Sequence, residues 1–315
     1  MRTSRLYAWG KTVEIEETGP LGQPADGEVM VAMEAAAVGH LDLTVMTGTF
    51  SYRPELPFTP GAVGVGTVTA GEPSLVGKRV LVRGGGVGLE RAGTWAQQVA
   101  APVDAVRVVP DGADAALVAT WFAPVTTAWA ALGPVGRISE GERVLVTGPR
   151  GGVGSMAVQL AARAGAHVIA LVRDEKEAAA VPSAAAEVVI GQGRAAQERL
   201  AALGGVDAVL DTVGGDTVPT LLPAIAPGGR VVMIGYVAGK TLTLDLPNLM
   251  AADVSLLPVN MVRRSVPDDV LTTLLTELGS GTFALNTLTF PLTDLNKALE
   301  VRAGSGVSGT VAVTM

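Results

Sequence analysis

The segment Arg143–Ala166, RVLVTGPRGGVGSMAVQLAARAGA, decides the fold of this chain. Its apolar run Val144–Thr147 is typical of a buried strand, Gly148–Gly154 predicts a tight turn, and the residues from Ser155 onward suit an amphipathic helix. A helix begins with N–H groups that lack partners within the helix, and its macrodipole is positive at that end. Glycines there let a pyrophosphate approach the backbone, so the segment predicts a dinucleotide site.

The glycine spacing of this turn matches the dinucleotide-binding pattern G-x-G-x-x-G only in part. With the pattern aligned on Gly151 and Gly154, its first glycine falls on Pro149, and Gly148 lies one place too early. A tight strand-to-helix connection that binds nothing is therefore the alternative. The context favours binding, because a second apolar run, Ala166–Val172, follows the helix as in a parallel βαβ unit.

The composition excludes several classes of function. A chain of 315 residues is long enough for about two domains, and 48% hydrophobic with 17% charged residues allow a large buried core. The net charge of −7, from 23 basic and 30 acidic residues, argues against a nucleic-acid surface, which needs clustered Lys and Arg. The absence of cysteine excludes disulfides, thiolate zinc sites and a cysteine nucleophile.

No segment predicts export or membrane insertion. The N-terminus lacks a basic start followed by an apolar core, and no uncharged apolar run reaches the length of about 18 residues that a membrane span needs. The longest apolar stretch, Ala115–Leu132, contains Pro124 and several Thr and Trp residues, and we interpret it as a pair of buried helices. We therefore expect a cytoplasmic protein with no membrane partner and no nucleic-acid partner.

Glycine, proline and apolar residues divide the chain into three parts. Short alternating runs at the start predict a small β-barrel; they are 29–35, 64–70, 79–82, 96–99 and 106–109. From about Ala119 to Leu257 strands alternate with helices, as in a parallel sheet; these elements are 144–147, 155–164, 167–172, 206–210, 217–225 and 230–235. The last part returns to mixed elements, expected near 268–279, 287–291, 293–302 and 310–313.

Several motifs, in this order, resemble the zinc-independent quinone oxidoreductases, the zeta-crystallin-like family of the medium-chain dehydrogenase/reductase superfamily. The motifs are Thr47–Phe50, Leu56–Gly61, Thr127–Trp129, Gly151–Gly154, Gly205–Asp216 and Gly228–Gly235. The resemblance implies an α/β fold, in which a Rossmann doubly wound parallel sheet is inserted into a GroES-like β-barrel (α+β) catalytic domain, with the active site in the cleft between them. We place the two parts of the catalytic domain at 1–118 and 258–315, and the Rossmann domain at 119–257.

The residues after the second strand favour NADPH over NADH. In Rossmann dehydrogenases an acidic residue there bonds the ribose diol of NAD, whereas an arginine pairs with the 2′-phosphate of NADP. Val172 occupies this place, and Arg173, a bidentate phosphate donor, follows it. Asp174 could serve NAD after a one-residue shift, and Arg173 could be solvated surface only. Arg150 within the turn could reach a phosphate or point to solvent.

The resemblance implies a larger set of cofactor contacts. Residues and resemblance together give the expected cofactor-binding set, which is Thr127, Arg150, Gly151, Gly152, Val153, Gly154, Arg173, Gly235, Tyr236 and Asn260. Asn260 could bond the carboxamide or the substrate, or be a polar edge residue. The cluster Arg83–Gly88 mimics the cofactor turn, but no long helix follows it, so we expect a flexible loop there.

The ligands of the catalytic zinc in related alcohol dehydrogenases are missing from the matching places. Those enzymes have a Cys just after the second barrel strand and a His-Glu pair in a G-H-E turn, where this chain has Val38–Asp42 and Pro60–Gly64. The only histidines are His40 and His167, and a catalytic zinc needs three protein ligands. We expect no metal; a site built from His40, Asp42 and a distant carboxylate is the alternative.

Without a metal, hydride transfer favours an acceptor that is already electrophilic, such as a quinone or an enone, whose oxygen must meet hydrogen-bond or proton donors. Phe50 replaces a tyrosine that lines the pocket in several family members, and Gly39 replaces an asparagine typical of the family. His40 and Tyr52 are the remaining candidates for catalytic groups. His40 is a donor at the cleft or a helix-entry residue satisfied by the backbone, and Tyr52 is a pocket wall or an acid. Asp42 is expected to be a helix cap or a structural acceptor.

Residues and resemblance together predict an NADPH-dependent, metal-free reductase of quinones or α,β-unsaturated carbonyl compounds. A non-catalytic NADPH-binding protein of the crystallin or adaptor kind is the alternative from another class, and a metal-dependent alcohol dehydrogenase is the third. The family also suggests a homodimer that pairs an edge strand near Thr241–Leu246. We further expect a surface helix over Ala178–Ala186 and a structural role for His167.

Overall fold

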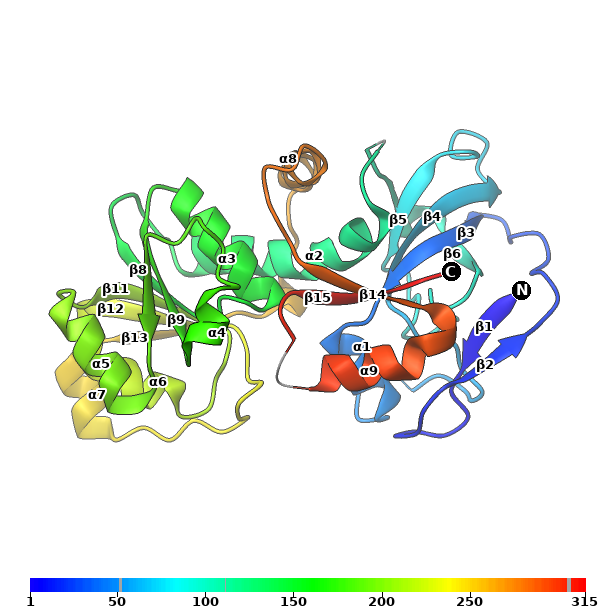
Figure 1. Cartoon of the computed structure of the whole chain (residues 1–315). Helices are drawn as coiled ribbons and strands as arrows, with labels where there is room; N and C mark the ends of the chain where they lie inside the picture. Colours follow the sequence, from blue (N-terminus) through cyan, green and yellow to red (C-terminus); the bar gives the residue numbers. More distant parts are fainter. Residues whose placement is uncertain (51–52, 111, 305–306) are drawn as a thin grey trace. The chain divides into compact units, whose positions relative to one another are not determined.

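The computed structural model describes residues 1–50, 53–110, 112–304 and 307–315 (Figure 1). Contacts separate two compact units: unit 1 is Met1–Phe122 with Leu275–Met315, and unit 2 is Ala123–Leu274. The chain passes between the units inside two helices, α2 (Ala115–Ala130) and α8 (Asp268–Gly279). We expected the domain boundaries after residues 118 and 257. In the structure the two units divide after residues 122 and 274.

Unit 2 is built on one parallel sheet of six strands (Figure 1). The strands are β8 (Arg143–Thr147), β9 (His167–Val172), β10 (Glu187–Ile190), β11 (Val206–Asp211), β12 (Ile225–Met233) and β13 (Ser255–Pro258). Their order is β10-β9-β8-β11-β12-β13, so the winding reverses between β8 and β11, as in a doubly wound sheet. Thr147 lies in register with both Leu171 and Asp211, so these strands end along one edge.

The strands of this sheet form where the sequence is continuously apolar. Val144, Leu145 and Val146 have no exposed surface, as expected of parallel strands covered on both faces. The helices that follow the strands are α3 (Gly152–Arg163), α4 (Glu175–Ala178), α5 (Gly193–Ala202), α6 (Thr217–Leu221) and α7 (Leu246–Ala252). Leu200 from α5 and Leu221 from α6 join the strands in one core cluster.

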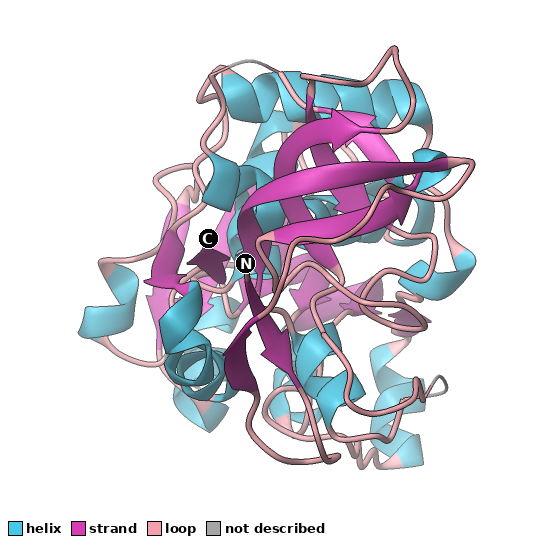
Figure 2. Cartoon of the chain, turned by 90° about the vertical axis from the view of Figure 1, so that its right-hand side faces the viewer, coloured by secondary structure: helices cyan, strands magenta, loops and turns pink. Residues whose placement is uncertain are grey.

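Unit 1 contains a seven-stranded sheet of order β14-β15-β3-β4-β5-β7, with β6 beside β3; Figure 2 shows its curved strands. The strands are β3 (Glu28–Ala37), β4 (Val63–Ala70), β5 (Arg79–Arg83), β6 (Gln98–Pro102), β7 (Val106–Val108), β14 (Thr287–Pro291) and β15 (Thr310–Thr314). All pairs are antiparallel except β14 with β15. A separate hairpin joins β1 (Arg2–Arg5) to β2 (Glu14–Glu17). The pairing of β15 with β3 brings the end of the chain back to its first part.

Two helices complete the core of unit 1, α1 (His40–Met46) and α9 (Leu295–Ala303). Leu6, Trp95 and Leu295 are fully buried in one cluster that draws on both ends of the sequence. Trp95 Nε1 donates a hydrogen bond to Ala37 O at 2.8 Å, so this large side chain is buried without an orphaned donor. Short helical turns occupy 103–105, 131–135, 222–224, 261–263 and 292–294.

Two expectations about local structure were wrong. The apolar stretch Ala115–Leu132 is one continuous helix, α2, extended by a π-helical turn over Ala131–Val135, and not a pair of helices. The alanine-rich run 178–186 is not helical, because α4 ends at Ala178 and Pro182 then lacks the N–H that a helix interior needs.

A third expectation, an edge strand near Thr241–Leu246, was also wrong. Residues 241–245 are not in a strand, and Leu246 already begins α7. Asp245 explains the helical start at Leu246, because it caps α7 by accepting a hydrogen bond from Asn248 N at 3.0 Å. The homodimer itself stays a prediction, but pairing of this strand no longer supports it.

The long helix that begins at Ala115 is strongly apolar. Among the described residues this one helix, Ala115–Val135, is long and apolar enough to span a membrane, with a mean hydropathy of 1.4. Because 72% of its most apolar window is buried inside the structure, it has the character of a core helix. The cytoplasmic location stays a prediction.

Candidate functional site

The glycine turn connects β8 to α3, as the segment Arg143–Ala166 predicted. Gly148 has a φ of +61°, a conformation that side chains rarely adopt, and the N–H of Gly151 donates to Gly148 O at 3.0 Å. A Cβ on Gly154 would lie only 2.1 Å from Gly148 O. The helix therefore packs directly on the turn, and it begins at Gly152 rather than at the expected residue Ser155.

The first turn of α3 presents backbone donors that the helix itself does not use. Ser155 N donates to Gly151 O at 2.8 Å, and no side chain caps the helix. Gly152, Val153 and Gly154 form the first turn of α3, where the N–H groups have no partner within the helix. Three open donors at the positive end of a 12-residue helix suit an anionic group such as a pyrophosphate.

The strand ends beside the turn are tied by a buried carboxylate. Asp211 is 1% exposed and accepts hydrogen bonds from Thr147 Oγ1 at 2.6 Å, Val213 N at 3.1 Å and Gly214 N at 3.0 Å. Thr147 Oγ1 accepts from Thr212 N at 3.1 Å, and Thr212 Oγ1 donates to Thr147 O at 2.8 Å. The network fixes the ends of β8 and β11, which border the glycine turn.

Arg150 and Arg173, the two arginines expected at a phosphate, are both held by one carboxylate that the sequence analysis missed. Glu177 Oε1 accepts from Arg150 Nη2 at 2.7 Å and from Arg173 Nε at 2.9 Å, and also from Arg173 Nη2. Glu177 Oε2 accepts from Arg173 N at 2.9 Å. These bonds, first that from the Arg173 side chain, lower the pKa of Glu177 to about 2. The guanidinium of Arg150 therefore does not simply point to solvent.

Asp174, the residue that could have served NAD, has a structural role in α4. Its side chain accepts a hydrogen bond from Glu177 N at 2.8 Å, which makes it the N-cap of that short helix. Val172, at the end of β9, is 3% exposed, and it has no side-chain acceptor for a ribose hydroxyl. The side chain of Arg173 is 54% exposed and remains accessible beside its partner Glu177.

The other residues expected at the cofactor lie elsewhere in unit 2. Gly235 follows β12, donates to Asp211 O at 3.1 Å, and has no room for a Cβ, which would meet Thr212 O at 2.2 Å. Tyr236 next to it is exposed, Asn260 follows β13 and is also exposed, and Thr127 is half-buried in α2. The structure thus brings Gly235 to the strand end that borders the turn, and the roles of Thr127, Tyr236 and Asn260 stay predictions.

In unit 1 Asp42 has the structural role that the sequence suggested. It lies in the first turn of α1, 4% exposed, where Oδ2 accepts from Gly39 N at 2.8 Å and Oδ1 accepts from Ala62 N at 2.9 Å. Burial raises the pKa of Asp42 to about 6, although these backbone hydrogen bonds oppose the rise. Its carboxylate therefore joins α1 to the segment that precedes β4.

His40 begins the same helix, and its ring lies in a partly dehydrated setting although the residue is exposed. Loss of hydration, and then the charge of Arg302, lower the pKa of His40 to about 4, so the ring is neutral at pH 7. Arg302, on α9, is partly buried, and its Nε has no hydrogen-bond partner in the described part of the chain. Tyr52, the other candidate for a catalytic group, lies outside the described residues.

The histidine expected to have a structural role, His167, lies at the surface of unit 2. Its Nε2 is 2.7 Å from Glu187 Oε1, and the pair joins the starts of β9 and β10. In the glycine cluster Arg83–Gly88, Arg83 ends β5 and the glycines after it form tight turns with no helix following, as the sequence suggested. Hydrogen bonds such as Val87 N to Gly84 O at 3.0 Å hold these turns in place.

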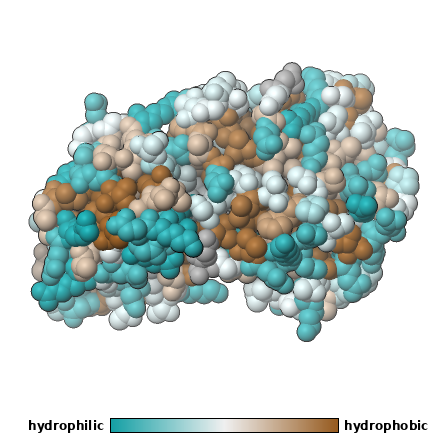
Figure 3. Space-filling view, viewed as in Figure 1, coloured by the Kyte–Doolittle hydropathy of each residue, from teal (hydrophilic) through white to brown (hydrophobic). Residues whose placement is uncertain are grey.

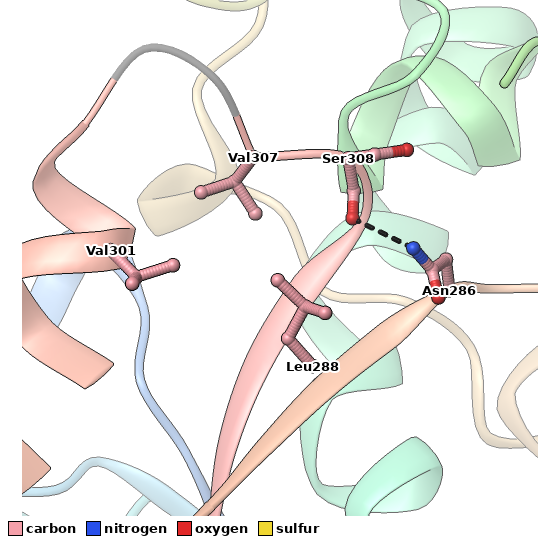
Figure 4. A pocket seen from close by; sticks show the side chains of 5 residues that line it. All are labelled: Asn286, Leu288, Val301, Val307 and Ser308. Carbon is pink, nitrogen blue, oxygen red and sulfur yellow. Dashed lines mark hydrogen bonds between the residues drawn. The ribbon is translucent and has the colours of Figure 1, made fainter. Parts of the chain in front are cut away.

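A pocket of about 340 Å³ in unit 1 contains none of the expected site residues. It is lined by Asn286, Leu288, Val301, Val307 and Ser308, as Figure 4 shows. Asn286 Nδ2 donates to Ser308 O at 3.1 Å, and the three aliphatic side chains form the rest of the wall. Its lining therefore offers packing surface but no titratable group for the expected chemistry.

Apolar side chains reach the surface of the molecule in patches, as Figure 3 shows for one face. Within unit 2 the large exposed ones include Tyr236, Val237, Leu246 and Met250, each at least 66% exposed. They flank or follow the segment 241–245 in sequence.

No group of three potential ligands for a metal ion occurs among the described side chains of His, Cys, Asp and Glu. Ala62 occupies the turn where zinc-dependent relatives have a ligand, and the chain has no cysteine. The residues present therefore do not fit a catalytic zinc, which needs three protein ligands.

Comparison with protein families gives two matches that follow one another along the chain. Residues 25–111 match the family described as alcohol dehydrogenase GroES-like domain. Residues 152–276 match the family described as zinc-binding dehydrogenase. Together with the doubly wound sheet, they confirm the expected fold class, a Rossmann-type sheet inserted in the sequence of a GroES-like domain.

Three curated proteins illustrate the sequence similarity. Prostaglandin reductase-3 of Bos taurus is 29% identical over 260 residues, which are 81% of this chain and 67% of that protein. The probable acrylyl-CoA reductase AcuI of Escherichia coli is 28% identical over 258 residues, 80% of each chain. A mycocerosic acid synthase-like polyketide synthase of Mycolicibacterium smegmatis is 30% identical over 305 residues, 93% of this chain and 14% of that much longer protein.

Two solved structures illustrate the similarity in fold. The crystal structure of AibC has a TM-score of 0.87 and 26% identity, and the match covers 100% of this chain and 95% of that one. The quinone oxidoreductase from Thermus thermophilus, solved also in complex with NADPH, has a TM-score of 0.75 and 26% identity over the whole of both chains.

Proposed function

We infer a reductase function from one premise: this chain belongs to the medium-chain dehydrogenase/reductase superfamily, and within it to the zinc-independent quinone oxidoreductase family. We propose that it is an NADPH-dependent, metal-free enzyme that reduces a quinone or an α,β-unsaturated carbonyl compound. The observation that carries the proposal is the first turn of α3, where close-packed glycines leave three backbone N–H groups open to a pyrophosphate.

The names of the similar proteins support this reaction class. One is a prostaglandin reductase, one a probable acrylyl-CoA reductase and one a quinone oxidoreductase solved with NADPH. Acrylyl denotes an acyl group whose C=C bond is conjugated with its carbonyl, and a quinone is likewise a conjugated acceptor. Such acceptors take a hydride without a metal that polarises the carbonyl. This agrees with the side chains of this chain, which do not fit a catalytic zinc.

The residues of unit 2 supply what a bound NADPH needs. The N–H groups at Gly152–Gly154 would hold the pyrophosphate, and Arg173 with Arg150 would meet the 2′-phosphate. Val172 offers no acceptor to a ribose diol, and Asp174 is engaged as a helix cap. When bound, this cofactor supplies the hydride.

The residues of unit 1 supply candidates for the oxygen end of the reaction. His40 is neutral at pH 7 because its pKa is lowered to about 4, so it offers an N–H donor rather than an acidic imidazolium. Asp42 is committed to two backbone N–H groups and does not serve as a base. We propose His40 as the donor at the substrate oxygen and Tyr52 as the second candidate.

Turnover with purified protein tests the reaction. We expect the absorbance of NADPH to fall when a panel of quinones and enones is added, with no dependence on added zinc. Cofactor binding seen by fluorescence, with no turnover on any acceptor, would favour the non-catalytic binder instead. Stoichiometric zinc in elemental analysis would favour an alcohol dehydrogenase.

The choice of cofactor is tested by Arg173→Ala. Removing a guanidinium that meets a phosphate should weaken NADPH binding about 10-fold or more, since a hydrogen bond to a charged group contributes about 1.5–3 kcal/mol. NADH affinity should change little. Arg194→Ala is the matched control, because Arg194 is an exposed arginine of the same unit, paired with Glu198 on α5. Equal binding of NADH and NADPH by the unmodified protein would contradict the role of Arg173.

We also propose that the enzyme is a homodimer of the cytoplasm. The first statement follows from the family and the second from the expectation drawn from the sequence, and neither follows from a contact in the structure. Light scattering of the purified protein gives the mass in solution, and a monomer at working concentration would contradict the first statement. Cell fractionation tests the second.

A further inference from the structure

Glu177 bonds both arginines that the proposed function assigns to the 2′-phosphate. The proposed function gives Glu177 itself no role. We propose that Glu177 is an internal competitor of the 2′-phosphate: its carboxylate occupies donors of Arg150 and Arg173, and so it sets how strongly the chain prefers NADPH to NADH. The inference rests on the proposed function.

Two guanidinium groups converge on a single oxygen of this carboxylate. Glu177 Oε1 accepts from Arg150 Nη2 at 2.7 Å, from Arg173 Nε at 2.9 Å and from Arg173 Nη2. Charge-assisted donors that meet at one anionic oxygen also make up a phosphate site. The carboxylate of Glu177 therefore stands in the protein as an oxygen of a phosphate would stand.

The carboxylate is also fixed from the backbone side. Its second oxygen accepts from Arg173 N at 2.9 Å, and the N–H of Glu177 itself bonds the capping Asp174 at 2.8 Å. Its side chain is only 10% exposed. Glu177 is thus a defined part of the β9–α4 turn and not a mobile surface partner.

The two arginines come from the segments that border the adenosine half of a dinucleotide in this fold. Arg150 belongs to the glycine turn after β8, and Arg173 follows β9. Thr147 and Leu171, near the ends of these strands, are in register. In a doubly wound sheet the ribose of the adenosine lies over these two strand ends, so a 2′-phosphate there meets the same donors that Glu177 uses.

The charges explain why the competition acts on NADPH alone. Two guanidinium cations meet the carboxylate of Glu177, and the carboxylate of Asp174 lies near enough to Arg173 to favour its charged form, so two positive and two negative charges gather here. A phosphate monoester adds about −1.5 to −2 charges at pH 7, close to a carboxylate that is ionised. NADH brings a hydroxyl to the same place and meets no such repulsion. Each guanidinium has five N–H groups, so the phosphate can share the arginines with Glu177 at a reduced affinity.

The replacement Glu177→Gln tests the competition, because it keeps the size of the side chain and one acceptor oxygen but removes the charge. Glu175→Gln is the matched control: Glu175 lies in the first turn of the same helix, is exposed, and has the same charge change without a bond to either arginine. Dissociation constants for NADPH and NADH are measured by fluorescence titration. In Glu177→Gln, removing a unit charge within a few Å should lower the dissociation constant for NADPH about 10-fold and change that for NADH less than about twofold. In Glu175→Gln both dissociation constants should stay within about twofold of those of the unmodified protein.

A second probe isolates the phosphate from the rest of the cofactor. Adenosine 2′,5′-bisphosphate carries the 2′-phosphate, and adenosine 5′-monophosphate does not. Calorimetric titration should show tighter binding to Glu177→Gln for the bisphosphate only. The readout needs neither substrate nor turnover.

The results that overturn the inference are distinct from those that overturn the proposed function. If the unmodified protein binds NADPH but the affinity is unchanged or weaker in Glu177→Gln, Glu177 only positions the arginines and the competition is wrong. Glu177→Ala provides the same comparison if the glutamine variant does not fold, as judged by circular dichroism. If the unmodified protein binds neither NADPH nor NADH, both the function and the inference fail.

Discussion

The close approach of Gly154 to Gly148 makes a sharp prediction about the glycine turn. In Gly154→Ala the added Cβ would lie 2.1 Å from Gly148 O, 2.8 Å from Gly148 C and 3.1 Å from Pro149 Cα. All three are atoms of the backbone or bonded to it, so no side-chain rotation relieves the contact. In Gly151→Ala the nearest atom is Gly148 O at 3.4 Å, which is ordinary van der Waals contact. Comparing the two variants therefore separates the effect of the clash from the effect of replacing a glycine of the turn.

The size of the effect follows from this geometry. Moving Gly148 O from 2.1 Å to 3.4 Å from the new Cβ means a shift of more than 1 Å between the turn and the helix. Overpacking costs up to about 3 kcal/mol, and alanine regains about 1 kcal/mol over glycine inside a helix. The free energy of unfolding of Gly154→Ala should therefore fall by about 2 kcal/mol, and its Tm by about 4–8 °C for a domain of this size. Gly151→Ala should stay within about 1 kcal/mol of the unmodified protein.

Thermal unfolding followed by circular dichroism, without cofactor, measures the difference in stability. Titration with NADPH then measures binding, which both variants should weaken, because each places a methyl group where the turn is expected to meet the pyrophosphate. If Gly154→Ala unfolds at the same temperature as Gly151→Ala, the packing argument is wrong. If both bind NADPH normally, the turn is not the phosphate site.

Two further predictions concern buried carboxylates. Asp211→Ala leaves the hydroxyl of Thr147 and the N–H of Gly214 without their acceptor, so urea denaturation should show about 3 kcal/mol less stability, at about 1–3 kcal/mol for each stranded group. Burial raises the pKa of Asp42 from 3.8 to about 6, so the contribution of Asp42 to the free energy of unfolding should fall by up to about 3 kcal/mol as pH rises from about 4 through about 6. The lowered pKa of His40 raises stability by a similar amount over the same pH range in both proteins, so the test is the difference in free energy of unfolding between the unmodified protein and Asp42→Asn, which should fall by that amount as pH rises.

The sequence was sufficient to predict the parallel sheet, because its strands are apolar runs buried on both faces. Val144–Thr147 and His167–Val172 lie where their composition placed them, within a residue at either end. The short strands β10 and β13 were not predicted, since four residues give little periodic signal. The start of α3 was also placed too late, because glycine has a low helix propensity and only the packing on Gly148 shows why Gly154 belongs inside the helix.

The parts of the site that depend on converging side chains could not be predicted in this way. Asp211 stands in the motif Gly205–Asp216, but its three hydrogen bonds come from Thr147 and from the backbone after β11. The lowered pKa of His40 depends first on the loss of hydration in the fold and then on the charge of Arg302, which lies at the far end of the sequence. Spacing along the chain indicates which residues share a strand or helix, whereas these contacts are set by tertiary packing.

Cofactor preference shows most clearly the difference between what the sequence indicates and what tertiary packing sets. From the sequence, Arg173 after Val172 is an arginine free to bind a phosphate, and the expected preference for NADPH follows from that one charge. In the folded protein the donors of Arg173 and Arg150 already meet Glu177, so the preference depends on a difference between attraction to two cations and repulsion from a carboxylate. We therefore expect the unmodified protein to discriminate between NADPH and NADH less than a site with two unpaired arginines would. Salt should reduce the discrimination in the unmodified protein less steeply than in Glu177→Gln, where the phosphate faces a larger net positive charge.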